Sequence, residues 1–184
     1  MKSNCASMAP CNRRYFLGLG LVVASVAAAP ALMAEAIEPR QLAFYHTHTG
    51  EHLTATYWEN GSYVPGALSQ IDYILRDFIN GELRRIDRRL LDLLVDLHGR
   101  LGSDAPFEII SAYRSPSTNA MLRAKSDGVA QHSYHIKAMA IDIRLRDVPL
   151  TRLHSEALAM KRGGVGMYPA SNFVHVDTGP VRYW

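Results

Sequence analysis

The alternation of apolar and polar residues early in the chain predicts two strands. Residues 41–48 and 52–58 are rich in aromatic and β-branched side chains, and Gly50 lies in the short connection between them. Such a pair of segments around a glycine-containing turn is typical of a β-hairpin.

Farther along, apolar residues recur at the spacing of an α-helix. This periodicity predicts amphipathic helices over 67–79, over 87–101 with an end near Gly99, and over 150–161. A hydroxyl residue, Ser117, can cap a short helix that runs through Lys125.

Four further short apolar segments predict strands, and the last two are expected to pair: 107–113, 140–145, 165–168 and 173–176. Helices that precede a run of short strands indicate the α+β class. We therefore expect a small, mostly antiparallel sheet flanked by helices.

The N-terminal segment differs from the rest of the chain. Arg13 and Arg14 precede an apolar run over 17–29 and candidate small-residue cleavage sites such as Ala34-Glu35-Ala36, which resembles a twin-arginine export signal. We expect residues 1–36 to be this signal, residues 37–184 to be the mature domain, and the periplasm to be its location. An uncleaved anchor is the alternative. No later segment reaches the ~20 apolar residues of a membrane helix.

Charge and cysteine content exclude some classes of function and of metal site. Residues 1–36 hold three basic residues and one acidic residue, so the net charge of +3 falls to +1 in residues 37–184. A near-neutral domain lacks the basic surface of a nucleic-acid-binding protein. Both cysteines, Cys5 and Cys11, also lie in the first segment, so any metal bound by the mature domain must be held by histidine and carboxylate.

Three residues form a candidate metal site. Asp142 lies between two isoleucines of a predicted strand, where a carboxylate is costly unless it is paired or bound to a cation. His175 occupies a similar position between two valines, and His135 precedes Asp142 by seven residues. Three protein ligands leave a position for water, which is the arrangement of a catalytic zinc ion. The alternative is a buried salt bridge beside an unrelated core histidine.

A second group of histidines competes with this site. His46 and His48 share a strand face, and His52 lies nearby, but no strand-embedded carboxylate accompanies them. They are more typical of a surface hairpin, although His48 could line a substrate groove. His132 lies in a predicted loop and is expected to be a polar loop residue.

Several motifs resemble those of the zinc peptidases that include D-Ala-D-Ala carboxypeptidases and lysostaphin-type endopeptidases, and most closely the MepK type of murein endopeptidase. The resembling segments are 48–51, 111–116, 128–130, 133–135 with Asp142, 163–166 and 171–179. This resemblance implies the hedgehog/D-Ala-D-Ala-peptidase fold.

The resemblance also implies roles for individual residues. One Zn²⁺ ion per chain would be held by His135, Asp142 and His175. Arg114 would stabilise the oxyanion that forms on the scissile carbonyl, and Ser133 would contact substrate or only cap a turn.

Two positions depart from the family pattern. Ala138 stands where relatives usually have glycine, which affects the expected loop geometry. Relatives place a glutamate or histidine just before the final histidine as general base, and this chain has Asn172, Phe173 and Val174 there. Asp177 shares the face of His175 and is the remaining candidate for the base, or else it orients His175.

The implied function is hydrolysis of peptide cross-links in peptidoglycan by a zinc-dependent endopeptidase. A D,D-carboxypeptidase and a non-catalytic cell-wall-binding module with a structural zinc ion are the alternatives. The sequence does not distinguish a D-alanyl–diaminopimelate cross-link from a diaminopimelate–diaminopimelate cross-link.

Overall fold

The computed structural model describes residues 38–126 and 128–184. The expected export signal over 1–36 lies outside these residues. No helix in the described part of the chain is long and apolar enough to cross a lipid bilayer.

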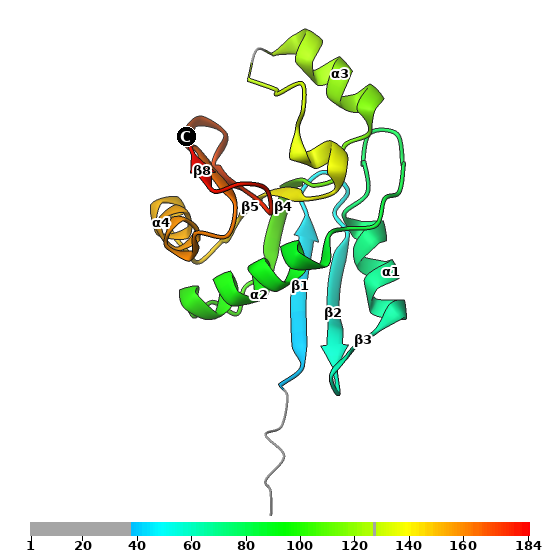
Figure 1. Cartoon of the computed structure of the whole chain (residues 1–184), viewed down its shortest axis with the longest axis vertical. Coiled ribbons are helices and arrows are strands. Elements are labelled where there is room, and N and C mark those ends of the chain that lie inside the picture. Colours follow the sequence, from blue (N-terminus) through cyan, green and yellow to red (C-terminus); the bar gives the residue numbers. More distant parts are fainter. Residues whose placement is uncertain (1–37, 127) are drawn as a thin grey trace, which may run out of the picture. The chain divides into compact units, whose positions relative to one another are not determined.

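All strands of the described residues join one eight-stranded sheet, in the order β3-β2-β1-β4-β5-β7-β6-β8 (Figure 1). The pairings β1–β4 and β6–β8 are parallel and the other five are antiparallel. The predicted α+β class with a mostly antiparallel sheet is confirmed. The strands are Arg40–His46 (β1), His52–Glu59 (β2), Ser62–Tyr63 (β3), Phe107–Ser111 (β4), Ala140–Arg144 (β5), Gly164–Tyr168 (β6), Phe173–Asp177 (β7) and Arg182–Tyr183 (β8).

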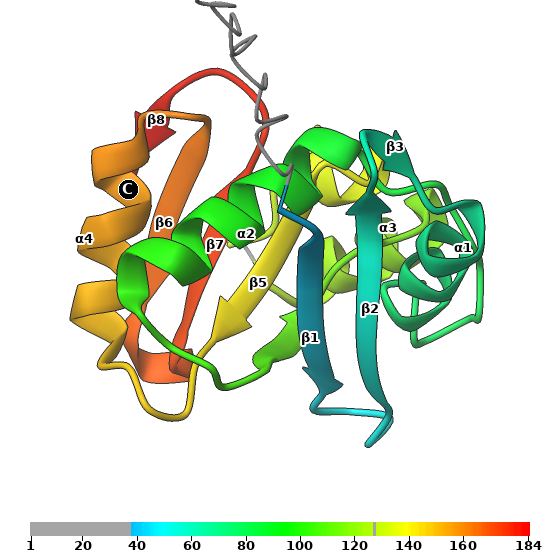
Figure 2. The same cartoon turned by 90° about the horizontal axis from the view of Figure 1, so that it is seen from below.

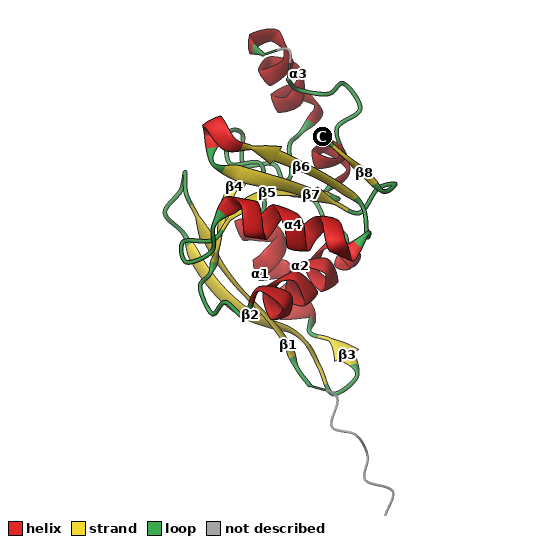
Figure 3. Cartoon of the chain, turned by 90° about the vertical axis from the view of Figure 1, so that its left-hand side faces the viewer, coloured by secondary structure: helices red, strands yellow, loops and turns green. Residues whose placement is uncertain are grey.

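Four α-helices accompany the sheet: Pro65–Ile74 (α1), Arg88–Leu101 (α2), Pro116–Lys125 (α3) and Leu150–Met160 (α4). In Figure 2, α2 lies across β1 and β5. The helix α2 packs against α4, whereas α1 packs against β2. Figure 3 shows α3 apart from these helices.

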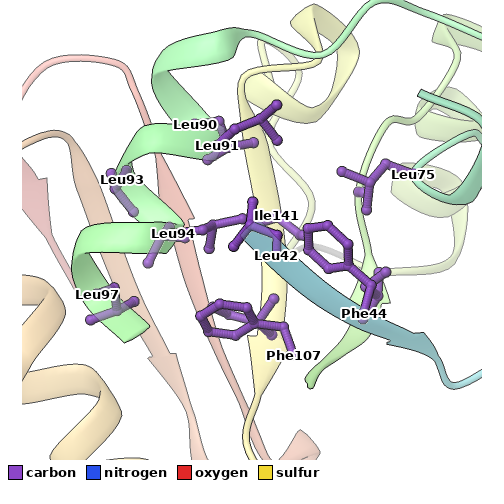
Figure 4. Packing of buried hydrophobic residues seen from close by; sticks show 14 of the residues in the cluster. Leu42, Phe44, Leu75, Leu90, Leu91, Leu93, Leu94, Leu97, Phe107 and Ile141 are labelled. Atoms are coloured by element: carbon purple, nitrogen blue, oxygen red, sulfur yellow. The ribbon is translucent and has the colours of Figure 1, made fainter. Parts of the chain in front are cut away.

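The core forms where the leucine-rich face of α2 meets the sheet (Figure 4). Leu90, Leu94 and Leu97 are fully buried and face Ile141 and Phe107. Burial of each leucine side chain contributes roughly 1.5–3 kcal/mol. Because side chains alternate along a strand, the face of β5 opposite Ile141 is free to carry polar groups.

The predicted hairpin and the pairing of β6 with β7 are confirmed, but some helix boundaries were wrong. The first helix ends at Ile74 instead of residue 79, because Asp77 accepts hydrogen bonds from Ile79 and Ser115 and holds a turn there. The helix α2, in contrast, ends at Leu101 as the predicted range 87–101 has it, and Gly102 terminates it in a left-handed conformation.

The cap of α3 was also wrong by two residues. Ser115, not Ser117, caps this helix through a hydrogen bond from the Thr118 amide, and Pro116 occupies the first helical position, where its missing N–H costs nothing.

Candidate active site

Two of the expected ligand residues lie side by side on neighbouring strands of the sheet. Asp142 on β5 and His175 on β7 are direct partners in the antiparallel register. His135 lies on a 3₁₀ turn over Tyr134–Lys137 that leads into β5, and the Ser133 hydroxyl caps this turn by accepting a hydrogen bond from the His135 amide.

Ala138 closes the 3₁₀ turn with a φ of 54°, in the left-handed region. This conformation costs about 1–2 kcal/mol in a residue that has a Cβ. The chain therefore adopts the turn that glycine would favour, although alanine occupies the position.

The three side chains converge on a common point. His175 Nδ1 lies 2.8 Å from Asp142 Oδ1 and 3.2 Å from His135 Nε2, and His135 Nε2 lies 3.2 Å from the same carboxylate oxygen. All three residues are buried, and among the described residues they form the group whose spacing could hold a metal ion.

Groups behind the two histidines fix which nitrogen faces this point. His135 Nδ1 lies 2.6 Å from the Ala112 carbonyl, and His175 Nε2 lies 2.9 Å from Asp177 Oδ2. Because a carbonyl or carboxylate oxygen only accepts, each of these outer nitrogens carries the proton. A neutral ring offers the lone pair of its inner nitrogen to a cation, whereas in the protonated ring of His175 Nδ1 donates to Asp142 Oδ1 at 2.8 Å. Burial lowers the pKa of His175, but its hydrogen bonds to Asp142 and Asp177 outweigh burial and raise that pKa above its ordinary value.

The electrostatics of the cluster suit a cation. Burial lowers the pKa of His135, which favours the neutral ligand form. Burial also disfavours ionised Asp142, but the two histidines outweigh it and hold the pKa of this carboxyl well below its ordinary value. Two nitrogen lone pairs and one carboxylate match the donor set of a catalytic zinc site, so these residues fit a divalent metal ion.

Arg114 lies directly beside the cluster. Its Nε donates to Ser111 Oγ at 2.8 Å, and one terminal nitrogen donates to Asp142 Oδ2 at 2.6 Å. Its backbone amide donates to the His135 carbonyl at 3.2 Å. The guanidinium is thus fixed at the edge of the cluster by Ser111 at the end of β4 and Asp142 on β5.

Asp177 lies behind His175 instead of beside the open site. Its side chain is 0% exposed and accepts from His175, from Arg182, and from the amides of Gly164 and Gly179. Burial would raise the pKa of Asp177, but these hydrogen bonds hold it well below its ordinary value. Both oxygens are occupied, and the carboxylate does not border the pocket described next.

A pocket of about 460 Å³ opens onto the cluster. The expected ligands His135, Asp142 and His175 line it together with Arg114 and Ser133, so the structure brings these five residues together. Its remaining lining residues include His132, Tyr134, Tyr168, Phe173, Arg182 and Trp184.

Sequence reasoning missed Arg182 and Trp184, although β6 carries a signal for them. Gly164 and Gly166 share one strand face, and glycine inside a strand often marks a close approach of another segment. A Cβ on Gly164 would lie 2.4 Å from an Arg182 nitrogen, and a Cβ on Gly166 would lie 2.3 Å from the Trp184 indole.

The rival histidines do not join the cluster. His46 is 1% exposed, and its ring packs edge-on against Phe78, on which His48 is stacked. His48 does not line the pocket beside the cluster, and His52 is exposed and stacked on Tyr45.

This group could hold a divalent metal ion beside a fixed guanidinium, and metallopeptidases use such a pair of positive charges on a peptide carbonyl. Residues 34–184 match the family described as Peptidoglycan L,D-endopeptidase MepK. The chain belongs to this family of metal-dependent peptidases, which confirms the predicted family and the predicted enzyme class.

Individual relatives agree with this assignment. The chain is 41% identical over 176 residues to the peptidoglycan L,D-endopeptidase MepK of Escherichia coli K12, covering 94% of this chain and 97% of that protein. It is 41% identical over 177 residues to the probable peptidoglycan L,D-endopeptidase MepK of Haemophilus influenzae, covering 94% and 95% respectively.

Proposed function

We propose that this protein is a zinc-dependent peptidoglycan endopeptidase that hydrolyses L,D peptide cross-links. The observation that carries the proposal is the convergence of His135, Asp142 and His175 on one point at the base of the pocket. The names of the relatives support peptidoglycan as the substrate and the L,D bond as the target.

An L,D bond joins the carbonyl of an L centre to the amine of a D centre. Of the two cross-links considered from the sequence, diaminopimelate–diaminopimelate contains such a bond, whereas D-alanyl–diaminopimelate is a D,D bond. The proposed substrate is therefore the diaminopimelate–diaminopimelate cross-link.

In this proposal His135, Asp142 and His175 hold one zinc ion per chain. Zinc bound there would supply Lewis-acid chemistry, because it polarises a carbonyl and makes a neighbouring water more acidic. Arg114 faces the same space and stabilises negative charge that develops on the scissile carbonyl oxygen. Ser133 holds the turn that positions His135 and contacts the substrate from the pocket wall.

We further propose that Asp177 orients His175 and is not the general base. Its oxygens already accept five hydrogen bonds, and it lies on the side of His175 away from the pocket. A carboxylate in this position fixes the tautomer of a metal-binding histidine. The proton of the attacking water then goes to another group.

A peptidoglycan substrate also requires export. We propose that residues 1–36 form a cleaved twin-arginine signal, that residues 37–184 are the mature peptidase domain, and that it acts in the periplasm. Fractionation of cells with and without the Arg13→Lys/Arg14→Lys change tests the route, since loss of both arginines is expected to retain the protein in the cytoplasm.

Digestion of purified peptidoglycan tests the activity. The protein, His175→Ala and the matched control His52→Ala are incubated with the substrate, with and without a chelator, and the products are identified by mass spectrometry. We expect the protein and His52→Ala to convert diaminopimelate-linked dimers to monomers, and chelation or His175→Ala to abolish this. Loss of one terminal residue would instead indicate a carboxypeptidase, and binding without cleavage would indicate a binding module.

A further inference from the structure

Trp184 is held beside the candidate metal site by the edge of the sheet. Its amide donates to the Val165 carbonyl at 3.2 Å, and its carbonyl accepts from the Met167 amide at 3.2 Å. These two hydrogen bonds flank Gly166, which is the direct partner of His175 in the pairing of β6 with β7. The backbone of Trp184 is thereby fixed one strand away from a candidate ligand.

The side chain of Trp184 is fixed as well. The indole occupies the space above Gly166, where a Cβ would lie 2.3 Å from the ring. Its ring centre lies 5.2 Å from that of His175, and Nε1 donates to the Tyr168 hydroxyl at 2.7 Å. The Arg182 guanidinium lies 5.1 Å from the ring centre. The indole therefore has a defined orientation next to the site.

Despite these contacts, Trp184 is 48% exposed and its open part borders the pocket. A large apolar surface that is held rigidly and left open to a pocket is typical of ligand-binding walls, because the ligand completes its burial without a cost in side-chain ordering. Phe173 and Tyr168, stacked with ring centres 4.6 Å apart, extend this wall.

We propose that Trp184 is a substrate-binding residue whose indole packs against the methylene chain of the diamino acid at the scissile bond. The inference rests on the proposed function and identifies the part of the substrate that binds to the wall formed by Trp184, Phe173 and Tyr168. Consecutive Cα atoms of a peptide lie ~3.8 Å apart, and the ring centres of Trp184 and His175 are 5.2 Å apart. A substrate group that contacts the indole therefore belongs to a residue at or next to the scissile bond. The occupant is thus the peptide and not the glycan strand.

Intrinsic fluorescence gives a direct test, because the chain has two tryptophans. The Trp58→Phe change leaves Trp184 as the reporter, and Trp58 Nε1 makes no hydrogen bond within residues 38–126 and 128–184 that the change would remove. The metal-loaded variant is mixed rapidly with a sugar-free, diaminopimelate-linked peptide dimer. We expect a saturable change in emission before cleavage, half-complete near the KM. No change with a dimer that is cleaved, or a change with the murein disaccharide alone, overturns the inference.

Kinetics of variants provide the second test. Trp184→Ala is expected to raise KM about tenfold with a smaller effect on kcat and unchanged metal affinity. Gly166→Ala displaces the indole without altering it, so it should raise KM similarly. In the double variant the two effects should not add, because the Trp184→Ala change frees the space that the new Cβ needs.

An unchanged KM in Trp184→Ala, or lost metal affinity that accounts for its defect, overturns the inference while leaving the proposed function intact. If the wild-type protein cleaves no dimer, the proposed function fails, and the fluorescence titration still decides whether the peptide contacts Trp184.

Discussion

The change Asp177→Asn separates the two roles that this residue could have. An amide presents one oxygen and one NH₂ group, whereas all five hydrogen bonds to Asp177 come from donors. Either orientation of the amide therefore sets its NH₂ group against at least two donors. The orientation that costs fewer contacts faces His175 and Arg182, and it requires His175 Nε2 to become an acceptor.

The proton of His175 would then move to Nδ1, the nitrogen that faces Asp142 and His135. This removes the lone pair offered to the metal. Loss of such an orienting carboxylate typically lowers metal affinity 10–100-fold, or about 1.4–2.8 kcal/mol. The buried NH₂ group left against the Arg182 donor also lowers the stability of the fold, by about 1–3 kcal/mol.

Competition with a chromophoric chelator measures the metal affinity of the wild type, Asp177→Asn and the control Asp147→Asn. The control carboxylate accepts hydrogen bonds from the Ser103 hydroxyl, outside the pocket. We expect a 10–100-fold weaker affinity in Asp177→Asn alone. Unchanged affinity with lost cleavage would refute the orienting role and return Asp177 to the role of general base.

Three other predictions concern the site and the fold. Arg114→Lys replaces the planar guanidinium, which reaches Ser111 and Asp142 from two separate nitrogens, by a single ammonium nitrogen, so kcat/KM should fall about 100-fold. An initial rate within about twofold of wild type would contradict this. Burial, with a smaller contribution from His48, lowers the pKa of His46 to about 4. The unfolded chain therefore binds a proton near pH 5 that the folded protein does not. The contribution of His46 to the free energy of unfolding is fully present above about pH 6.5 and should fall by up to ~3 kcal/mol as the pH is lowered to 4. Urea unfolding of His46→Gln should lack this loss, whereas exposed His52→Gln should keep it. Leu94→Ala should cost about 3 kcal/mol; a melting temperature within about 2 °C of wild type would show that the core adjusts.

The strands that carry the site could be predicted because their signal is local. Asp142 between isoleucines and His175 between valines each contradict the apolar pattern of a buried strand, and alternation alone puts them on the opposite face from Ile141. Arg114 came from a motif resemblance, and the structure places it beside Asp142.

The rest of the pocket depends on contacts that no local pattern encodes. The strand β8 is two residues long, too short for any periodicity, and it reaches the site only because Gly164 and Gly166 let Arg182 and Trp184 approach β6. Alternation predicts that Asp177 and His175 share a face, but not that other donors already occupy the Asp177 carboxylate.

The register of β5 against β7 has a consequence for mutational tolerance. Ile141, Ile143, Val174 and Val176 belong to the apolar core, while Asp142 and His175 alternate with them and face the candidate site. Substitutions along these strands should therefore fall into two interleaved classes. One class lowers the amount of folded protein, and the other leaves the fold but removes activity. A saturation scan that scores abundance and cleavage separately would show sensitivity of abundance and sensitivity of cleavage at alternate residues. Stability and activity can therefore be changed at neighbouring positions with little effect on each other.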